Sequence, residues 1–318
     1  MAFYDVFNGD ADGICALHQL RLAVPREATL VTGVKRDIAL LDRVPAGAGD
    51  EVTVLDISLD KNRVALGRIL AAGARVAYFD HHYPGEIPDH PNLEATIDTR
   101  SETCTALLVD AALKGRFRPW AVVAAFGDNF HAAAERAAAP LGLSRTRLDR
   151  LRELGELINY NGYGARVEDL HFPPDALYRR IRPYEDPFAF MDQDPAFAAL
   201  KQGYEEDLAH THALRPAMEG DHYAIYLLPA EPWARRVSGV FANRLARARP
   251  ERAHALLTAL PEGGYVVSVR APLERRTGAD ALCREFSTGG GRPAAAGINH
   301  LPEADVERFA ARMAEAFA

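Results

Sequence analysis

Acidic and imidazole side chains follow three separate apolar, strand-like segments of this sequence. In chain order these side chains are Asp10, Asp12, Asp56, Asp80, His81 and His82. Carboxylates that are brought close together repel one another and resist burial unless a cation lies among them. Oxygen ligands combined with an imidazole suit Mn²⁺ or Mg²⁺ better than a metal that prefers thiolates. Taken singly, each acid is more often a turn residue or a helix cap, but the combination predicts a centre for two metal ions.

The segments around these residues alternate between strand-like and helix-like patterns in the first third of the chain. Strands are predicted for residues 3–8, 28–34, 51–58 and 75–80, and helices for residues 12–24, 60–74 and 101–115. Such alternation is typical of a parallel sheet covered by helices. In open parallel sheets, ligands bind outside the carboxyl ends of the strands. The acids and histidines fall at those ends.

The rest of the chain indicates a helical extension and a second, smaller α/β unit. Residues 120–200 are mainly helical in pattern, and residues 182–197, which contain three prolines, are expected to form a surface connection. Beyond it, strands are predicted for residues 222–228, 253–260 and 265–271, and helices for residues 233–248, 279–286 and 303–317. The sequence PEGG at residues 261–264 predicts a hairpin. Residues 287–297, STGGGRPAAAG, are expected to be a loop.

Composition and charge narrow the class of protein. The chain has 318 residues and a formal net charge of −7, which argues against a protein that coats long nucleic acid but leaves short anionic substrates open. The three cysteines lack metal-like spacing, no apolar run is long enough to cross a membrane, and the N-terminal residues do not resemble a signal peptide. We therefore expect a cytoplasmic protein with reduced thiols. The basic residues are almost all arginine; the lysines are Lys35, Lys61, Lys114 and Lys201.

Short motifs of the sequence resemble, in order and spacing, those of the DHH phosphoesterase superfamily. The motifs are GDADG at residues 9–13, LDIS at 55–58, DHH at 80–82, SVR at 268–270 and GGGRPAAAG at 289–297. The last two resemble the C-terminal DHH-associated domain of one branch. The resemblance implies an α/β fold, with a parallel-sheet catalytic domain and helical extension at residues 1–190, a linker at 191–218 and a smaller substrate-binding α/β domain at 219–318. It also implies an active site in the cleft between the two domains.

The resemblance further implies two divalent metal ions, with Mn²⁺ favoured and Mg²⁺ or Co²⁺ as alternatives. One ion would be held by Asp10 and Asp56. The other would be held by Asp12, Asp56, His81 and Asp128, so that Asp56 bridges the two ions. Asp128 is chosen because it ends an apolar run at about the distance expected for the fourth motif of the family.

Asp80 and His82 receive catalytic roles from the resemblance, beside the bridging Asp56. His82 would face the substrate phosphate, and Asp80 would orient the two imidazoles. Many members of the family carry a histidine where this chain has Val6, whose aliphatic side chain cannot bind a metal. Asn8 lies on the same side of the predicted strand. An amide-oxygen ligand and an ordinary turn residue both remain open for Asn8.

The C-terminal motifs imply a substrate-binding site. Its residues would be Ser268, Arg270, Gly289, Gly290, Gly291 and Arg292. Glycine lets a backbone approach a ligand closely, and arginine contacts phosphate or stacks on a base. The family commonly has a histidine where this chain has Arg292, so the specificity could differ.

The activity implied by the resemblance is hydrolysis of short nucleotide phosphodiesters or phosphomonoesters. Oligoribonucleotides, linear dinucleotides and nucleoside bisphosphate are the expected substrates, attacked in line by water at a two-metal centre. A non-enzymatic nucleotide sensor with a degraded metal site is one alternative, and Val6 favours it. A single-strand DNA exonuclease is another, but those of the family are larger and this chain is acidic. The expected partner is a short nucleotide rather than a membrane or long DNA; a homodimer stays open.

Overall fold

The computed structural model describes all 318 residues, and the chain divides into two compact units, Met1–Gln202 and Gly203–Ala318. Within residues 191–218, which we expected to form a linker, Pro195–Thr211 form helix α9. None of the helices combines the length and the apolar character that crossing a lipid bilayer requires. Each unit has its own β-sheet.

The first unit is built on a five-stranded sheet in which all neighbouring strands are parallel. In spatial order, the strands are β2 (Thr29–Val31), β1 (Phe3–Phe7), β3 (Glu51–Leu55), β4 (Arg75–Asp80) and β5 (Leu93–Ile97). The predicted parallel sheet is therefore confirmed, with a strand in each of the four expected segments. Strand β5 was not predicted. It follows a polar, proline-rich loop and pairs only with β4, at the edge of the sheet.

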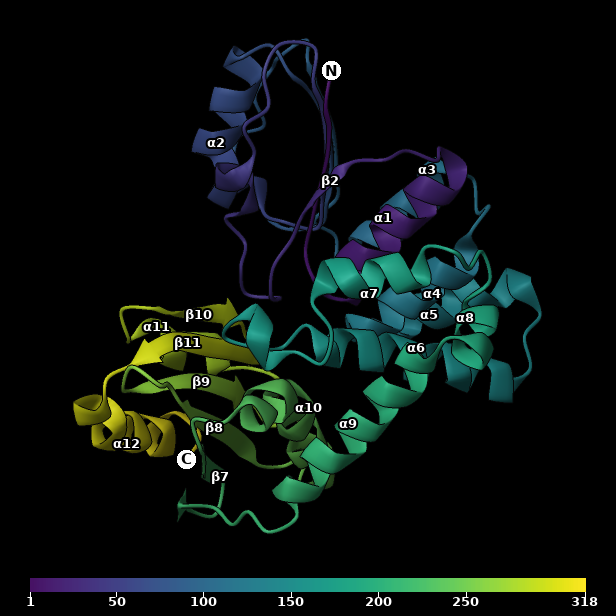
Figure 1. Cartoon of the computed structure of the whole chain (residues 1–318). Coiled ribbons are helices and arrows are strands. Elements are labelled where there is room, and N and C mark those ends of the chain that lie inside the picture. The colour runs from purple at the N-terminus through teal and green to yellow at the C-terminus, as the bar shows by residue number, and fades with distance from the viewer. The chain divides into compact units, whose positions relative to one another are not determined.

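Helices lie on both sides of this sheet (Figure 1). They are α1 (Ala11–Ala23), α2 (Leu59–Ala71), α3 (Thr105–Ala112) and the short 3-10 helix η1 (Leu40–Arg43). Helix α2 and η1 share a core with one face of the sheet, in which Val54, Ile69 and Tyr78 are fully buried. Helices α1 and α3 lie on the opposite side. Burial on both faces explains why the strands read as nearly continuous apolar runs.

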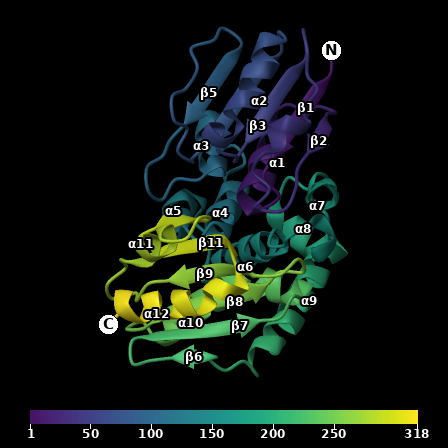
Figure 2. The same cartoon turned by 90° about the vertical axis from the view of Figure 1, so that its left-hand side faces the viewer.

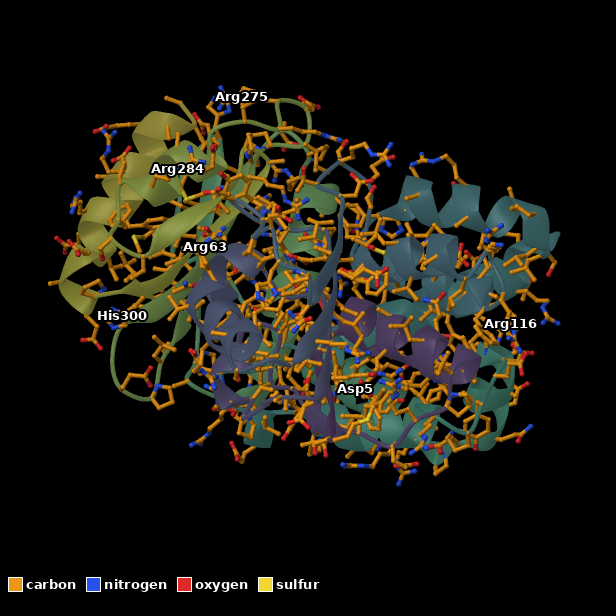
Figure 3. The ribbon with its side chains drawn as sticks, turned by 90° about the horizontal axis from the view of Figure 1, so that it is seen from above. Asp5, Arg63, Arg116, Arg275, Arg284 and His300 are labelled. Atoms are coloured by element: carbon orange, nitrogen blue, oxygen red, sulfur yellow. The ribbon has the colours of Figure 1, made fainter.

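A buried ion pair fixes helix α1 against the sheet. Asp5 of β1, which is labelled in Figure 3, accepts a hydrogen bond from Nε of Arg21 in the last turn of α1, at 2.8 Å. Arg21 also donates to Oγ1 of Thr53 on β3, at 3.0 Å. Because α1 starts just after β1 ends, these contacts anchor the far end of α1 and help to orient its first turn at the sheet edge.

The helical extension of the first unit is confirmed. It contains α4 (Arg118–Gly127), α5 (His131–Ala138), η2 (Ala139–Leu141), α6 (Arg145–Asn161), η3 (Val167–Asp169), α7 (Pro174–Ile181), α8 (Pro187–Gln193) and the first part of α9, which continues into the second unit. Helix α4 is almost wholly buried from Trp120 onward, and it packs against α1 and α6. Gly155 permits the close approach of α6, because a side chain there would collide with the carbonyl oxygen of Val123. The expected surface connection at residues 182–197 was wrong in part: it forms α8 and the start of α9, with Phe190 fully buried.

The second unit is built on a six-stranded mixed sheet (Figure 2). In spatial order, the strands are β10 (Gly289–Arg292), β11 (Ala295–Leu301), β9 (Tyr265–Arg270), β8 (Ala253–Ala259), β7 (Tyr223–Leu228) and β6 (Met218–Glu219). Strands β7 and β8 are parallel, and the other neighbours are antiparallel. One face packs against α11 (Ala279–Arg284) and α12 (Val306–Ala316), which follows η4 (Glu303–Asp305); the other packs against α10 (Pro232–Ala248).

The glycine-rich residues 287–297 form a hairpin rather than the expected loop. Strands β10 and β11 pair antiparallel, with Gly290 opposite Gly297 and Arg292 opposite Ala295. Glycine is depleted in strands, so its clustering favoured a loop. Pairing with β11, which itself pairs with β9, overrides that local preference at the edge of the sheet. The predicted hairpin between β8 and β9 is confirmed.

Candidate metal centre

The carboxyl ends of the neighbouring strands β1, β3 and β4 bring the predicted acids and histidines together. We call this group the acid edge; it comprises Asp10, Asp12, Asp56, Asp80, His81, His82 and Asp128. Asp10 follows β1 and caps α1, since its Oδ1 accepts hydrogen bonds from the backbone N–H groups of Asp12 at 3.0 Å and Gly13 at 3.2 Å. Asp128 reaches the group from the end of α4. The structure therefore gathers the acids that the sequence singled out.

Asp56 holds a backbone conformation that few residues adopt. It follows β3 directly and has a φ of 61°, in the left-handed region. Aspartate and asparagine tolerate this region better than most side chains, because their short polar groups can hydrogen-bond locally. The backbone N–H of Asp56 donates to the carbonyl oxygen of Phe79 on β4, at 3.0 Å. Strain that the surrounding structure maintains in this way is typical of functional sites.

His81 lies at the centre of the acid edge. Its Nδ1 is 2.8 Å from the carbonyl oxygen of Thr103, so Nδ1 carries the proton and Nε2 is left as an acceptor. Nε2 lies 3.4 Å from Oδ1 of Asp56, 3.6 Å from Oδ2 of Asp128 and 3.9 Å from Oδ2 of Asp12. Ligand atoms that share a small divalent ion at about 2.1 Å lie about 3 Å or somewhat more apart. Asp12, His81 and Asp128 form one group whose ligand atoms lie close enough to hold a divalent ion, and Asp56 forms a second such group with His81 and His82.

Asp12 is fixed by the start of another helix. It is fully buried, and its two oxygens accept hydrogen bonds from the backbone N–H groups of Thr105 and Ala106, each at 2.7 Å. Both donors lie in the first turn of α3, so Asp12 satisfies backbone groups that lack a partner within that helix. The hydroxyl of Thr105 also donates to Oδ1 of Asp56, at 3.2 Å. No local sequence pattern indicated these contacts with α3.

The acid edge is electrostatically costly without a cation. Burial, together with the charges of Asp12 and Asp10, raises the pKa of Asp56 well above its ordinary value. Burial also raises the pKa of Asp12, although the nearby His81 opposes that change. Buried carboxylates with raised pKa values gain from a divalent ion, which favours their ionised forms. This supports the fit of a metal on the side of His81.

Asp80 and His82 form a pair beside this centre. Nδ1 of His82 lies 2.7 Å from Oδ1 of Asp80, and the His82 side chain is 46% exposed, whereas Asp80 is fully buried. Burial lowers the pKa of His82, but the hydrogen bond and charge of Asp80 outweigh it, so the pKa is raised. His82 therefore offers a half-exposed, readily protonated imidazole next to the metal ligands. Asp80 thus orients the imidazole of His82, whereas the carbonyl oxygen of Thr103, and not Asp80, is the hydrogen-bond partner of His81 Nδ1.

Lys35 is a member of the site that sequence reasoning missed. Its ammonium pairs with Oδ2 of Asp10, and lies 3.1 Å from Oδ1 of Asp128 and 2.9 Å from Oδ1 of Asn159. Burial alone would lower the pKa of Lys35, but the charges of Asp10 and Asp128 hold it well above its ordinary value. The ring of Tyr163 lies 5.6 Å away, from centroid to ammonium. The available signal was weak: Lys35 is one of four lysines and follows a predicted strand.

Val6 and Asn8 precede Asp10, where the sequence indicated that the first metal ion lacks the histidine ligand common in the family. Val6 is fully buried in the core shared with α2 and offers no ligand. Asn8 donates from Nδ2 to the carbonyl oxygen of Lys35 at 3.2 Å, and its Oδ1 is buried without a hydrogen-bond partner. Of the residues predicted for the first ion, Asp10 pairs through Oδ2 with the ammonium of Lys35, so a divalent ion would have to compete with that ammonium for Asp10.

The predicted substrate-binding residues lie in the second unit, on β10 of the β10–β11 hairpin and on β9, which pairs with β11. Ser268 and Arg270 alternate onto one face of β9, and the register aligns Gly290, Gly297 and Ser268 in one row and Arg292, Ala295 and Arg270 in the next. We call the group formed by Ser268, Arg270, Gly290, Arg292 and Gly297 the arginine face. Nε of Arg270 donates to Oδ1 of Asn243 on α10, at 2.7 Å, which fixes one guanidinium. Asn243 was not predicted.

The three consecutive glycines of β10 differ in their surroundings. Side chains at Gly289 or Gly291 would collide with the backbone of Cys283 or of Ala296, so packing requires glycine at both positions. Gly291 also has a φ of 139°, which disfavours any other residue. A methyl group at Gly290 would meet nothing within 4 Å. Packing therefore requires glycine at positions 289 and 291 but not at position 290.

Comparisons with known proteins identify the fold. The sequence matches no protein-family model and no curated protein. The structure is similar to that of exonuclease RecJ bound to manganese, with a TM-score of 0.66 and 20% identity over 99% of this chain and 90% of the other. It is also similar to a DHH domain from a member of a family of ribosomal proteins, with a TM-score of 0.67 and 14% identity over 99% of this chain and 86% of the other.

A third similar structure is PggH, a pGpG-specific phosphodiesterase from Vibrio cholerae. Its TM-score is 0.53, and the 15% identity extends over 99% of both chains. At such identities the likeness concerns the fold. The chain shares the α/β fold of these structures, one of which is a DHH domain, and it has residues at the acid edge that could bind a metal ion.

Proposed function

We propose that this protein is a metal-dependent phosphoesterase that hydrolyses short nucleotide phosphodiesters or phosphomonoesters. The observation that carries the proposal is the convergence of three carboxylates on Nε2 of His81, at 3.4 to 3.9 Å, at the carboxyl edge of a DHH-type sheet. Mn²⁺ is the favoured ion, because the RecJ structure with the same fold is bound to manganese. Oxygen ligands and one imidazole agree with that choice.

Asp12, Asp56, Asp128 and His81 would hold the divalent ion. A bound ion supplies a Lewis acid that lowers the pKa of water and draws electron density from a phosphoryl group. The contact between His81 Nδ1 and Thr103 keeps the ring in the tautomer that a metal requires. The fold therefore prepares the ligands before the ion binds.

His82 would neutralise the phosphoryl group of the substrate. It is half-exposed beside the ligands, and Asp80 favours its protonated form. An imidazolium donates hydrogen bonds to the non-bridging oxygens of a phosphate, and charge that builds on those oxygens during attack strengthens the bonds. This would be the main contribution of the DHH motif besides the ligand His81.

The arginine face would bind the part of the substrate that does not react. Arg270 and Arg292 flank the small residue Ala295, next to the row that Gly290 and Gly297 share. Guanidinium groups bind phosphate in two-pronged geometry and stack on bases, and glycine lets the backbone approach a ring or ribose. A nucleotide with a second phosphate or base suits this arrangement better than a bare phosphate ester.

The assay that tests the proposal uses metal-stripped protein with Mn²⁺ and a panel of compounds. The panel contains a linear dinucleotide, short oligoribonucleotides, a nucleoside 3′,5′-bisphosphate and a p-nitrophenyl phosphodiester. We expect turnover of a nucleotide compound that chelator abolishes and Mn²⁺ restores. Absence of turnover together with tight nucleotide binding by calorimetry would favour a sensor instead, which is the alternative that Val6 supports.

A single-strand DNA exonuclease is the second candidate, because one similar structure is the exonuclease RecJ. Adding a long single strand of DNA to the same panel separates the two. The net charge of −7 predicts weak, salt-sensitive binding of such a strand. Efficient processive digestion of that strand, with little turnover of dinucleotides, would reverse our preference.

A further inference from the structure

Lys35 puts a cation of the chain itself into the acid edge. Its ammonium has three hydrogens, and three oxygens surround it: Oδ2 of Asp10, Oδ1 of Asp128 and Oδ1 of Asn159. The side chain is 23% exposed, so most of it is buried. These three acceptors satisfy all hydrogens of the ammonium and hold it in the buried site.

The surrounding backbone holds Lys35 in this position. Its own N–H donates to the carbonyl oxygen of Gly162 at 2.8 Å, and its carbonyl oxygen accepts from Nδ2 of Asn8 at 3.2 Å. Gly162 follows α6, the helix that also carries Asn159. The lysine is therefore fixed at its backbone from both sides, and at its ammonium by oxygens from three elements.

Both oxygens of Asp10 are already engaged by the chain. Oδ1 caps α1 through the N–H groups of Asp12 and Gly13, and Oδ2 pairs with Lys35. Val6, on the strand that precedes Asp10, has no ligand atom and is fully buried. A divalent ion at Asp10 would have to displace the ammonium, because Oδ2 of Asp10 is paired with Lys35 and Oδ1 caps α1.

Asp128 links the two sides of the acid edge. Its Oδ1 faces Lys35 at 3.1 Å, and its Oδ2 faces Nε2 of His81 at 3.6 Å. The ligands around His81 need no atom that Lys35 occupies, since Asp12, Asp56 and Oδ2 of Asp128 remain. One divalent ion and one ammonium can therefore share the site through Asp128.

We infer that Lys35 takes the place of one of two metal ions, so that this protein binds a single divalent ion, on the side of His81. The inference deepens the proposed function and rests on it. Lys35 neutralises Asp10 and Asp128 permanently, whereas a metal ion would exchange with solvent. The site then keeps two cationic positions, one of which is part of the polypeptide.

Equilibrium dialysis of the metal-stripped full chain counts the Mn²⁺ ions that it binds. The electron paramagnetic resonance spectrum of the manganese-loaded protein is then recorded. We expect one Mn²⁺ per chain and the six-line spectrum of an isolated ion. Two ions of similar affinity, with the spectrum of an exchange-coupled pair, would overturn the inference and leave the proposed function standing. Absence of bound Mn²⁺ would overturn both, because the ligand set around His81 would then be wrong.

A pair of variants assigns the effect to the charge of Lys35. Lys35→Ala removes the ammonium and should admit a second Mn²⁺ at Asp10 and Asp128, whereas Lys35→Arg keeps a cation and should bind one. Lys61→Ala is the matched control, since Lys61 is 63% exposed and lies 3.7 Å from Asp60. A Lys35→Ala chain that retains the wild-type circular dichroism spectrum yet binds one ion would refute the role of Lys35. If that variant fails to fold, the count for the wild-type chain decides alone.

Discussion

The acid edge of the first unit and the arginine face of the second unit gather functional residues in two different ways. All strands of the first sheet are parallel, so residues that follow different strands meet at one edge although they are far apart in the sequence. The strands that carry the arginine face, β10, β11 and β9, pair antiparallel, so its residues meet because they lie opposite one another on neighbouring strands. The difference teaches that acids after strands can be found from sequence, whereas cross-strand rows depend on register.

The two regions also differ in how charge is compensated. The acid edge concentrates carboxylates; Lys35 pairs with two of them, and His82 is hydrogen-bonded to a third, Asp80. The arginine face carries two guanidinium groups beside small residues, and Arg270 is oriented by a neutral amide, that of Asn243. In the proposed function, the acid edge binds a metal ion and the arginine face binds an anionic substrate.

Asp56→Asn should remove most of the activity. The asparagine keeps the size of the side chain and tolerates the φ of 61°, so the change isolates the loss of charge. We expect turnover with Mn²⁺ to fall by about 1,000-fold or more, because loss of a metal ligand withdraws several kcal/mol of transition-state stabilisation.

Steady-state kinetics and Mn²⁺ titration measure this loss, and the circular dichroism spectrum checks the fold. Asp60→Asn is a suitable control, because Asp60 lies in the first turn of α2, outside the acid edge. Near-normal turnover by Asp56→Asn would show that the acid edge is not the catalytic region.

Arg270→Ala should weaken substrate binding without harming the metal site. We expect KM to rise about tenfold or more, the value of one hydrogen bond to a charged group, with a smaller change in kcat. Mn²⁺ affinity should not change, which distinguishes the arginine face from the acid edge.

Arg284→Ala is the matched control on α11, where Arg284 pairs with Asp280 at 3.2 Å; Figure 3 labels Arg284. The kinetic assay of the proposed function serves as the measurement. An unchanged KM for every compound of the panel would remove the arginine face from the binding site.

Gly290→Ala and Gly291→Ala should separate ligand binding from folding within one strand. Gly290 has open space for a methyl group, so we expect its free energy of unfolding to stay within about 0.5 kcal/mol of wild type. Gly291 has a φ of 139° and a crowded Cβ position, and its variant should lose about 1 to 3 kcal/mol.

Urea unfolding of both variants gives these values, and KM for the substrate gives the effect on binding. We expect Gly290→Ala to raise KM by less than Arg270→Ala does. Equal losses in the free energy of unfolding of the two variants would contradict the difference in packing between Gly290 and Gly291.

Sequence reasoning found the parallel sheet because its strands are buried on both faces and read as continuous apolar runs. It found Asp10, Asp56 and His81 because each follows such a run. It missed β5, whose half-exposed edge position leaves no apolar run. It also missed the hairpin of β10 and β11, since pairing with a distant strand decides that structure rather than local glycine preference.

Lys35 and Asn159 could not be assigned to the site from the sequence. They lie 124 positions apart, and the contact between them depends on how α6 packs beside the sheet. A lone lysine after a short strand is ordinarily a solvated residue. Asn243 was missed for the same reason, because its contact with Arg270 depends on the packing of α10 on the second sheet. Such partners follow from tertiary packing and have no local pattern.

The double engagement of Asp12 by the first turn of α3 carries a warning for mutagenesis. A variant that lacks this carboxylate would lose the hydrogen bonds to the first turn of α3 as well as a metal ligand. Loss of activity through unfolding could then be mistaken for loss of catalysis. Conversely, any ion that arrives finds the Asp12 side chain already immobilised by Thr105 and Ala106, so little rotational freedom is sacrificed on coordination.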